Sequence, residues 1–253
     1  MKISLTTAAL AFFSAALLAA AGAAANQPIA AASGPTPVVV ELYTSQGCSS
    51  CPPADAYLGV LARRKDVVAL SFHVDYWDYI GWKDPFASAA ATERQRDYAR
   101  ALGLHMVYTP QMIVDGRADA VGSDQGAVEK LIAAAAKRER VDIGFSLDDM
   151  GRLFVELPNH PLAGMATVWL AVYDTQHKTT VARGENGGAT LSDFNVVREW
   201  RRVGTWPGSA VQLPVAMAPD ASAKHDGCAI IVQLGETGPI LAAAIVPLKK
   251  GGW

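Results

Sequence analysis

The pattern of apolar and polar positions divides the chain into two parts near Arg140. Before it, apolar runs at Val38–Tyr43 and Val67–Val74 predict buried strands, and apolar residues spaced three and four apart predict helices. After it, eight short β-leaning runs are separated by turns rich in Gly, Pro, Asn and Asp, which is typical of a sandwich or barrel. We therefore expect an α/β domain over residues 38–140, followed by an all-β sandwich-like or barrel-like domain over residues 141–253.

The N-terminal segment has a different pattern. A single Lys precedes an uncharged run rich in Ala, Leu and Phe from Ile3 to Ala25, which is typical of a secretory signal peptide. The small residues that close the run, with no Lys or Arg behind them, favour cleavage before Asn26 over a retained membrane anchor. We expect residues 1–25 to be a signal peptide and residues 26–37 a flexible leader. The mature protein is then periplasmic or secreted, with no membrane contact after cleavage.

Composition and charge narrow the class of protein. Of the 253 residues, 51% are hydrophobic and 18% are charged, a balance typical of a globular protein with a sizeable core. Residues 26–140 carry 12 basic and 13 acidic side chains, and residues 141–253 carry 9 and 11. Because neither half is basic, nucleic acid is not an expected partner.

Three cysteines, Cys48, Cys51 and Cys228, are too few for the disulfide framework of a small secreted domain. The ring that a Cys48–Cys51 bond closes is short and removes little chain entropy from the unfolded state, which argues against a structural staple. A haem site needs His where Pro52 stands, and no second Cys pair completes a zinc site. We expect no cofactor and no metal. Cys228 lies in an apolar run and is expected to be a buried, inert thiol.

The cysteine pair lies where a strand gives way to a helix. Thr44–Gly47 breaks the first strand, and the helical pattern begins at Cys48, with Pro52 tolerated in the first turn. The partial positive charge and free N–H groups of a helix N-terminus favour a thiolate. Cys48 is the expected nucleophile because it should be the more exposed cysteine. Cys51, one turn further in, is the expected resolving thiol.

The order of strand, Tyr-Thr, Gly-Cys-x-x-Cys and helix resembles the opening of a thioredoxin or glutaredoxin. The segment Tyr108–Arg117 is similar to the thioredoxin segment in which a cis proline opens a strand. The resemblance implies that Pro110 is cis and that the backbone of Thr109 lies beside the disulfide, where it pairs with an extended peptide or thiol substrate. Independently of the resemblance, the dipeptide Asp115-Gly116 predicts a type I′ turn between two strands.

A narrower resemblance rests on four short strings. His73–Asp78, Gly81–Phe86, Arg183–Asn186 and Asn195–Arg198 are similar to an exported bacterial family named domain of unknown function 1223. That family is placed among thioredoxin-like folds and has no settled activity. The resemblance therefore implies an α/β thioredoxin-like fold for the first domain, but it names no substrate.

The insertion between the second strand and the next helix is rich in aromatic and acidic residues. Because it follows the carboxyl end of a strand, it should lie on the same rim as the cysteines. Two interpretations stay open: Tyr76, Trp77 and Trp82 form an aromatic substrate platform, or they pack as a satellite core against the second domain. His73, with Asp75 near it on the rim, is either a proton donor or metal ligand near the thiols, or a strand-end histidine bonded to backbone.

A polar group in the second domain lies beside turn-forming glycines. Its members, Arg183, Glu185, Asn186 and Arg198, allow two interpretations. They are turn residues with an exposed Arg–Glu ion pair, or they form an edge that packs over the active-site rim and binds a carboxylate or a peptide backbone. Both interpretations stay open.

Three classes of function follow. The leading prediction is an exported thiol–disulfide oxidoreductase that acts on protein or small-molecule thiols through its Cys-x-x-Cys centre, with an unidentified redox partner. The second is a copper-handling protein in which Cys48 and Cys51, with His73 or His105, are the ligands. The third is a non-catalytic binding module that uses the β domain and the aromatic rim.

Overall fold

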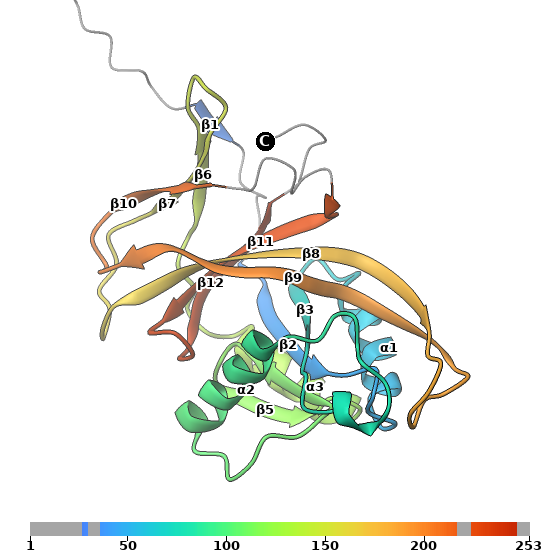
Figure 1. The fold of residues 1–253 in the computed structure, drawn as a ribbon. Helices are drawn as coiled ribbons and strands as arrows, with labels where there is room; N and C mark the ends of the chain where they lie inside the picture. Colours follow the sequence, from blue (N-terminus) through green and yellow to red (C-terminus); the bar gives the residue numbers. More distant parts are fainter. Residues whose placement is uncertain (1–26, 30–35, 217–223, 247–253) are drawn as a thin grey trace, which may run out of the picture.

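The computed structural model describes residues 27–29, 36–216 and 224–246 (Figure 1). The predicted signal peptide, residues 1–25, lies outside the described residues. Within the segment expected to be a leader, Gln27–Ile29 forms a strand that pairs with residues 145–147. In the described ranges, no helix combines the length and the apolar character needed to cross a membrane.

The described chain forms strands and helices in the following order. The elements are β1 (Gln27–Ile29), β2 (Val38–Thr44), α1 (Pro52–Leu61), β3 (Val67–His73), the 3-10 helix η1 (Asp78–Ile80), α2 (Ala89–Leu102), β4 (Gln111–Val114), β5 (Ala118–Val121), α3 (Gln125–Ala135), β6 (Gly144–Leu147), β7 (Leu153–Leu157), β8 (Ala166–Thr180), β9 (Thr190–Trp206), β10 (Val211–Val215), β11 (Gly227–Leu234) and β12 (Ile240–Val246). The strands form two sheets, one of four strands in the order β1-β6-β7-β10 and one of eight.

The predicted fold class is wrong. We expected an α/β thioredoxin-like domain followed by a separate all-β domain, but one mixed sheet in the order β12-β11-β8-β9-β3-β2-β4-β5 runs through both halves. Of the described residues, 42% are in strands and 19% in helices. The cause is the pairing of β9 with β3, in parallel, at Val196 and Ser71. Because of this pairing, β8, β9, β11 and β12 extend the sheet of the first half, while β6, β7 and β10 form the four-stranded sheet with β1.

Asn195 supports the junction between the two halves of the large sheet. Its φ is 45°, in the left-handed region that asparagine tolerates better than most residues. Its side-chain Nδ2 donates to the carbonyl oxygen of Ala69 in β3, 2.8 Å away. The side chain therefore supplies a hydrogen bond between β9 and β3 where the regular ladder is short.

Three buried hydrophobic clusters surround the large sheet. One lies between its β2-β3-β4 face and helices α1 and α3, and includes Leu42, Leu58, Met112 and Ile132. A second lies on the opposite face, under α2, and includes Tyr43, Phe72, Tyr98 and Ile231. The third lies between β8, β11 and β12 and the four-stranded sheet, and includes Val155, Leu170, Trp206 and Ile230. The large sheet is thus covered on both faces, which explains its continuous apolar strands.

A buried ion pair connects α2 to both halves of the sheet. Arg94 donates from Nε to Glu41 Oε2 (2.8 Å), and its guanidinium lies 4.0 Å from the ring centroid of Trp200 in β9. Tyr98 and Gln233 complete the hydrogen bonding around the pair. These partners satisfy the two buried charges.

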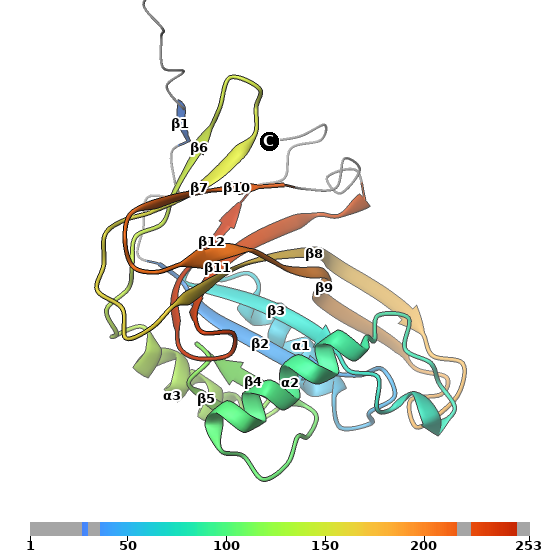
Figure 2. The same cartoon turned by 60° about the vertical axis from the view of Figure 1, so that its left-hand side comes forward.

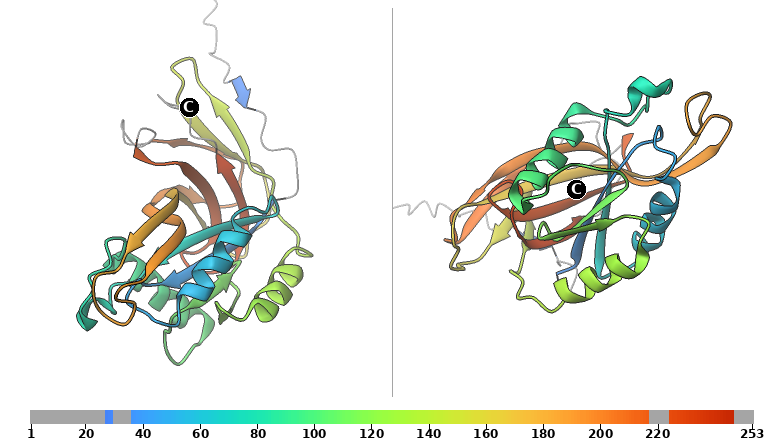
Figure 3. Two further views of the ribbon diagram at one scale, coloured as in Figure 1. Left: turned by 90° about the vertical axis from the view of Figure 1, so that its right-hand side faces the viewer. Right: turned by 90° about the horizontal axis from the view of Figure 1, so that it is seen from below.

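The predicted type I′ turn at Asp115-Gly116 is confirmed. The length of the β8–β9 hairpin was not predicted. Asp115 and Gly116 have φ values of 53° and 62°, as this turn requires. Where short separate strands were expected, β8 runs without a break to Thr180, and β9 begins at Thr190 after a turn. In Figures 2 and 3 the β8–β9 hairpin reaches past β3, and its tip lies beside the loop between β2 and α1.

Candidate active site at the Cys48–Cys51 turn

Cys48 and Cys51 lie in the turn between β2 and α1 and form a disulfide with Cα atoms 5.5 Å apart. Backbone hydrogen bonds close the turn, from Cys48 N to Ser45 O (3.1 Å) and from Cys51 N to Cys48 O (3.2 Å). The helix begins at Pro52, directly after Cys51. Because Pro52 and Pro53 have no N–H and the Cys51 N–H is already bonded, this helix N-terminus offers fewer free donors to a thiolate than we expected.

Cys48 was expected to be the more exposed cysteine, but both cysteines are buried. The exposed fraction of Cys48 is 1% and that of Cys51 is 0%, while Ser49 and Ser50 between them are exposed. Ser50 Oγ lies 3.3 Å from Cys48 Sγ. A hydroxyl at this place can donate to a thiolate once the disulfide is reduced. In this conformation, however, Cys48 Sγ has to be uncovered before another sulfur can reach it.

Several hydrogen bonds to the cysteine turn come from the other half of the sequence. They are formed by the tip of the β8–β9 hairpin, residues 181–189, hereafter the hairpin tip. Asn186 Nδ2 donates to the carbonyl oxygens of Gln46 (2.9 Å) and Cys48 (3.0 Å). One side-chain amide therefore holds both sides of the turn that precedes the disulfide.

Glu185 holds the spacer between the cysteines. The backbone N–H of Ser49 donates to Glu185 Oε2 (3.2 Å), and hydrogen bonding from this residue lowers the pKa of the Glu185 carboxyl. Within the described residues, Arg183 forms no ion pair with Glu185, and Arg198 Nε instead lies 3.7 Å from Asp174 Oδ2. For Glu185 and Asn186, the geometry favours the interpretation in which the polar group packs over the rim that carries the cysteines. For Arg183 and Arg198 it does not.

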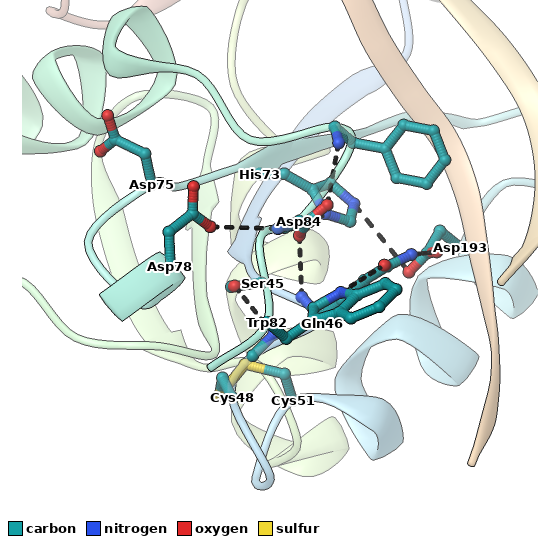
Figure 4. Close-up of polar contacts among 12 residues, drawn as sticks. Ser45, Gln46, Cys48, Cys51, His73, Asp75, Asp78, Trp82, Asp84 and Asp193 are labelled. Carbon is teal, nitrogen blue, oxygen red and sulfur yellow. Dashed lines mark hydrogen bonds and ion pairs between the residues drawn. A yellow bond between two sulfur atoms is a disulfide. The ribbon is translucent and has the colours of Figure 1, made fainter. Parts of the chain in front are cut away.

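Gln46 bonds to several parts of the site, a role that the sequence analysis did not predict. Its backbone N–H donates to Asp84 Oδ2 (2.8 Å) and its side-chain Nε2 donates to Asp193 Oδ2 (2.7 Å). Its Oε1 accepts from Trp82 Nε1 (3.1 Å), and Figure 4 shows this bond together with those to Asp84 and Asp193. Its carbonyl accepts from Asn186, so both its backbone groups and both its side-chain groups are bonded. Gln46 thereby connects the cysteine turn to the hairpin tip and to the buried acids behind it.

Trp82 packs against the hairpin tip. A Cβ on Gly184 would lie 3.3 Å from Trp82 Cβ, and Gly184 has a φ of 80°. Glycine is therefore needed here both for the close approach and for the left-handed backbone. Trp82 thus contacts the hairpin tip on one side and Gln46 on the other.

Tyr76 and Trp77 act mainly as packing residues. Both pack against the cluster under α2, which supports the satellite-core interpretation over an open substrate platform. Trp77 Nε1 donates to Thr109 Oγ1 (2.8 Å), and its Cβ lies 3.1 Å from where a Cβ on Gly47 would be. Trp77 therefore contacts both the cysteine turn and Thr109. The peptide bond between Thr109 and Pro110 is cis, as the resemblance implied.

His73 is buried among carboxylates rather than bonded to backbone. Its Nδ1 lies 2.7 Å from Asp84 Oδ2, and its Nε2 lies 4.0 Å from Asp193 Oδ1. Among the described residues, neither His73 Nε2 nor Asp193 Oδ1 has a hydrogen-bond partner. Burial opposes the charged form of His73, but the neighbouring carboxylates of Asp84, Asp193 and Asp55 outweigh it and raise the pKa of His73. Burial raises the pKa of Asp193. The cluster therefore favours a protonated imidazole between carboxylates.

Asp55 adds a further acid to this cluster. It lies in α1, one helical turn after Cys51, and is buried. Burial, with the charges of Asp193 and Asp84, raises the pKa of Asp55 to about 7 against the opposing effect of His73. An acid four residues after a cysteine, on an otherwise apolar helix face, was the sequence signal that could have identified it.

The remaining predicted residues lie away from the sulfur atoms. Asp75 is on the rim but turns toward α2, where its Oδ1 accepts from Thr92 Oγ1 (2.6 Å). His105 is exposed in the loop after α2. Across the described residues no group of three His, Cys, Asp or Glu is arranged to hold a metal ion. The copper hypothesis therefore gains no ligand set from the described residues.

Cys228 is the buried thiol that the sequence predicted. It is 0% exposed in β11, and its sulfur lies 3.4 Å from the carbonyl oxygen of Val246. Burial raises the pKa of this thiol to about 12. The group therefore stays protonated and unreactive in the folded protein.

Comparisons with known proteins agree with this architecture. The family described as "Protein of unknown function (DUF1223)" matches residues 39–233. The crystal structure of protein AGR_C_4864 from Agrobacterium tumefaciens is similar, with 34% sequence identity and a TM-score of 0.72, over 85% of this chain and 96% of that chain. HBP35 of Porphyromonas gingivalis is similar in fold alone, with 11% identity and a TM-score of 0.52, over 86% and 76% of the two chains. No curated protein matches this chain.

Proposed function

The chain belongs to the DUF1223 family, and we propose that it is an exported thiol–disulfide oxidoreductase that works through Cys48 and Cys51. The observation that carries the proposal is the disulfide between these two residues at the start of α1. A disulfide that closes so short a ring contributes little to stability, so redox chemistry explains the pair better than a structural role. The proposed substrates are thiols or disulfides of proteins or small molecules.

The proposed reaction is thiol–disulfide exchange in two steps. The Cys48 thiolate attacks one sulfur of a substrate disulfide, an S–S bond forms between them, and the second substrate sulfur leaves as a thiolate. The Cys51 thiolate then attacks Cys48 Sγ, the mixed disulfide breaks, and the substrate leaves as a dithiol. Two electrons pass from the cysteine pair to the substrate. The same steps in reverse oxidise a substrate dithiol, so a second dithiol–disulfide partner completes the cycle.

Two neighbouring residues support these steps. Ser50 Oγ, 3.3 Å from Cys48 Sγ, is positioned to donate a hydrogen bond to the thiolate. Asp55, one turn beyond Cys51 and with a pKa raised to about 7 by burial, is suited to take the proton of the resolving thiol near neutral pH. Neither role needs a cofactor.

Export is part of the proposal because of the N-terminal sequence. The apolar run Ile3–Ala25 supports secretion to the periplasm or beyond. Disulfides form and persist in such compartments, and a Cys-x-x-Cys centre there meets protein thiols that need oxidation or repair. The burial of both cysteines favours one competing function, a binding module in which the disulfide is inert.

The proposed function is tested by trapping the mixed disulfide. Cys51→Ala, expressed at native level in its own host, should accumulate partners linked to Cys48, because the resolving step is removed. Cys48→Ala is the matched control and should trap few partners. Thiol-linked species are separated on non-reducing gels and identified by mass spectrometry. Recovery of Cys51→Ala free of such partners would reject the oxidoreductase and favour the binding module.

A further inference from the structure

The hairpin tip forms three hydrogen bonds from its side chains to the backbone of the cysteine turn. Asn186 donates to the carbonyl oxygens of Gln46 and Cys48, and Glu185 accepts from the N–H of Ser49. Both carbonyls and the N–H belong to the backbone on either side of Cys48. Backbone carbonyl and N–H groups of this kind are also the groups through which a protein binds a polypeptide segment.

The exposure of the hairpin tip allows it to move away from the cysteine turn. Its residues from 182 to 189 are exposed except for Asn186, which points inward, and its base is held by the buried Val181. The N–H of Gly188 donates to the carbonyl of Val181 (2.8 Å), so the tip has a hydrogen bond of its own that does not depend on the cysteine turn. Because most of the tip is exposed, hydrogen bonds to water replace the lost ones at small cost when it moves.

Resting on the proposed function, we propose that the hairpin tip is an internal stand-in for a polypeptide substrate, which binds by displacing it. When the tip lifts, Cys48 Sγ becomes accessible. Backbone N–H groups of the substrate, next to its reacting cysteine, take over the carbonyls of Gln46 and Cys48. A substrate carbonyl takes over the N–H of Ser49. The preferred substrate is therefore an extended segment of a protein chain rather than a small thiol.

The first arm of the test measures how fast the disulfide is reduced by dithiothreitol. Asn186→Ala removes two hydrogen bonds of the closed tip and should raise the second-order rate constant on the order of tenfold. Glu185→Ala removes one bond and should give a smaller rise. The matched control is Thr190→Ala, an exposed residue of the same hairpin whose hydroxyl contacts only Thr180 among the described residues. Its rate should equal that of the natural protein.

The second arm tests recognition of the polypeptide backbone. Two dithiol peptides of the same sequence are compared as reductants, one with N-methyl groups on the residues flanking the attacking cysteine. The unmodified peptide should reduce the Cys48–Cys51 disulfide several-fold faster, because it alone can donate to the carbonyls of Gln46 and Cys48. Asn186→Ala should accelerate both peptides and keep the difference between them.

The outcomes separate this proposal from the oxidoreductase proposal. Equal dithiothreitol rates for Asn186→Ala and the natural protein overturn the displaceable tip, even if Cys51→Ala still traps partners. Equal rates for the two peptides overturn backbone recognition. A disulfide that resists both reductants even in Asn186→Ala, together with no trapped partners, overturns the oxidoreductase as well.

Discussion

Replacing Asp55 with Asn should change how the stability of the protein depends on pH. Asp55 is buried in α1, 6% exposed, beside a cluster that contains His73, Asp84 and Asp193. Burial is the largest cause that raises its pKa from 3.8 to about 7, and the two neighbouring acids add to it. The amide of Asn has a similar shape but does not titrate, so the variant removes the proton equilibrium with little change in volume.

The sign follows from proton linkage. An acid whose pKa is higher in the folded protein than in the unfolded chain binds its proton more tightly when folded. Its contribution to stability is fully present below about pH 4 and is lost as the pH rises through 7. The shift corresponds to roughly 4 kcal/mol between pH 4 and pH 8, at 1.36 kcal/mol for each pKa unit. The natural protein should lose this amount, and Asp55→Asn should not.

The measurement is urea unfolding of the oxidised protein, followed by tryptophan fluorescence at pH 4, 6 and 8. At each pH, the free energy of unfolding of the natural protein is subtracted from that of the variant. The value at pH 4 is then subtracted from the value at pH 8, so that any packing defect in the variant, which is the same at both pH values, cancels. Asp142→Asn, at an exposed carboxylate, is the control and should leave the pH profile unchanged. Parallel profiles for Asp55→Asn and the natural protein would refute the idea that this acid is held neutral by its surroundings.

Two further predictions concern the ion pair and metal content. Arg94→Ala leaves the buried Glu41 carboxylate without its partner and should lower the free energy of unfolding by about 3–5 kcal/mol. The double variant Arg94→Met with Glu41→Leu removes both charges and should recover much of this loss. A loss below about 1 kcal/mol in Arg94→Ala would contradict the buried ion pair. Purified protein should contain no stoichiometric zinc or copper by elemental analysis; one equivalent of copper that disappears in His73→Ala would instead support the copper hypothesis.

Local features of the site followed from the sequence because neighbouring residues determine them. The apolar run at Val38 ends where polar and glycine residues begin, and the prolines after Cys51 fit only the first turn of a helix. The Asp115-Gly116 turn follows from backbone conformations that few other residues adopt. These choices depend on sterics and hydrogen bonds within a few residues, so the cysteine pair and its place before α1 could be predicted.

The arrangement around the cysteines was decided only by the tertiary structure. Asn186 reaches the carbonyl of Cys48 from 138 residues away, and Gln46 meets Asp193 from 147 residues away. Both contacts depend on the pairing of β9 with β3, which joins the two halves into one sheet and which no local pattern specifies. The polar stretch between Asp174 and Thr190 has the composition of a loop, yet its first residues pair with β9 and its tip bonds to the cysteine turn. Burial of Asp55 and Cys48 was likewise not predictable, because a residue's exposure is set by what packs on it from elsewhere in the chain.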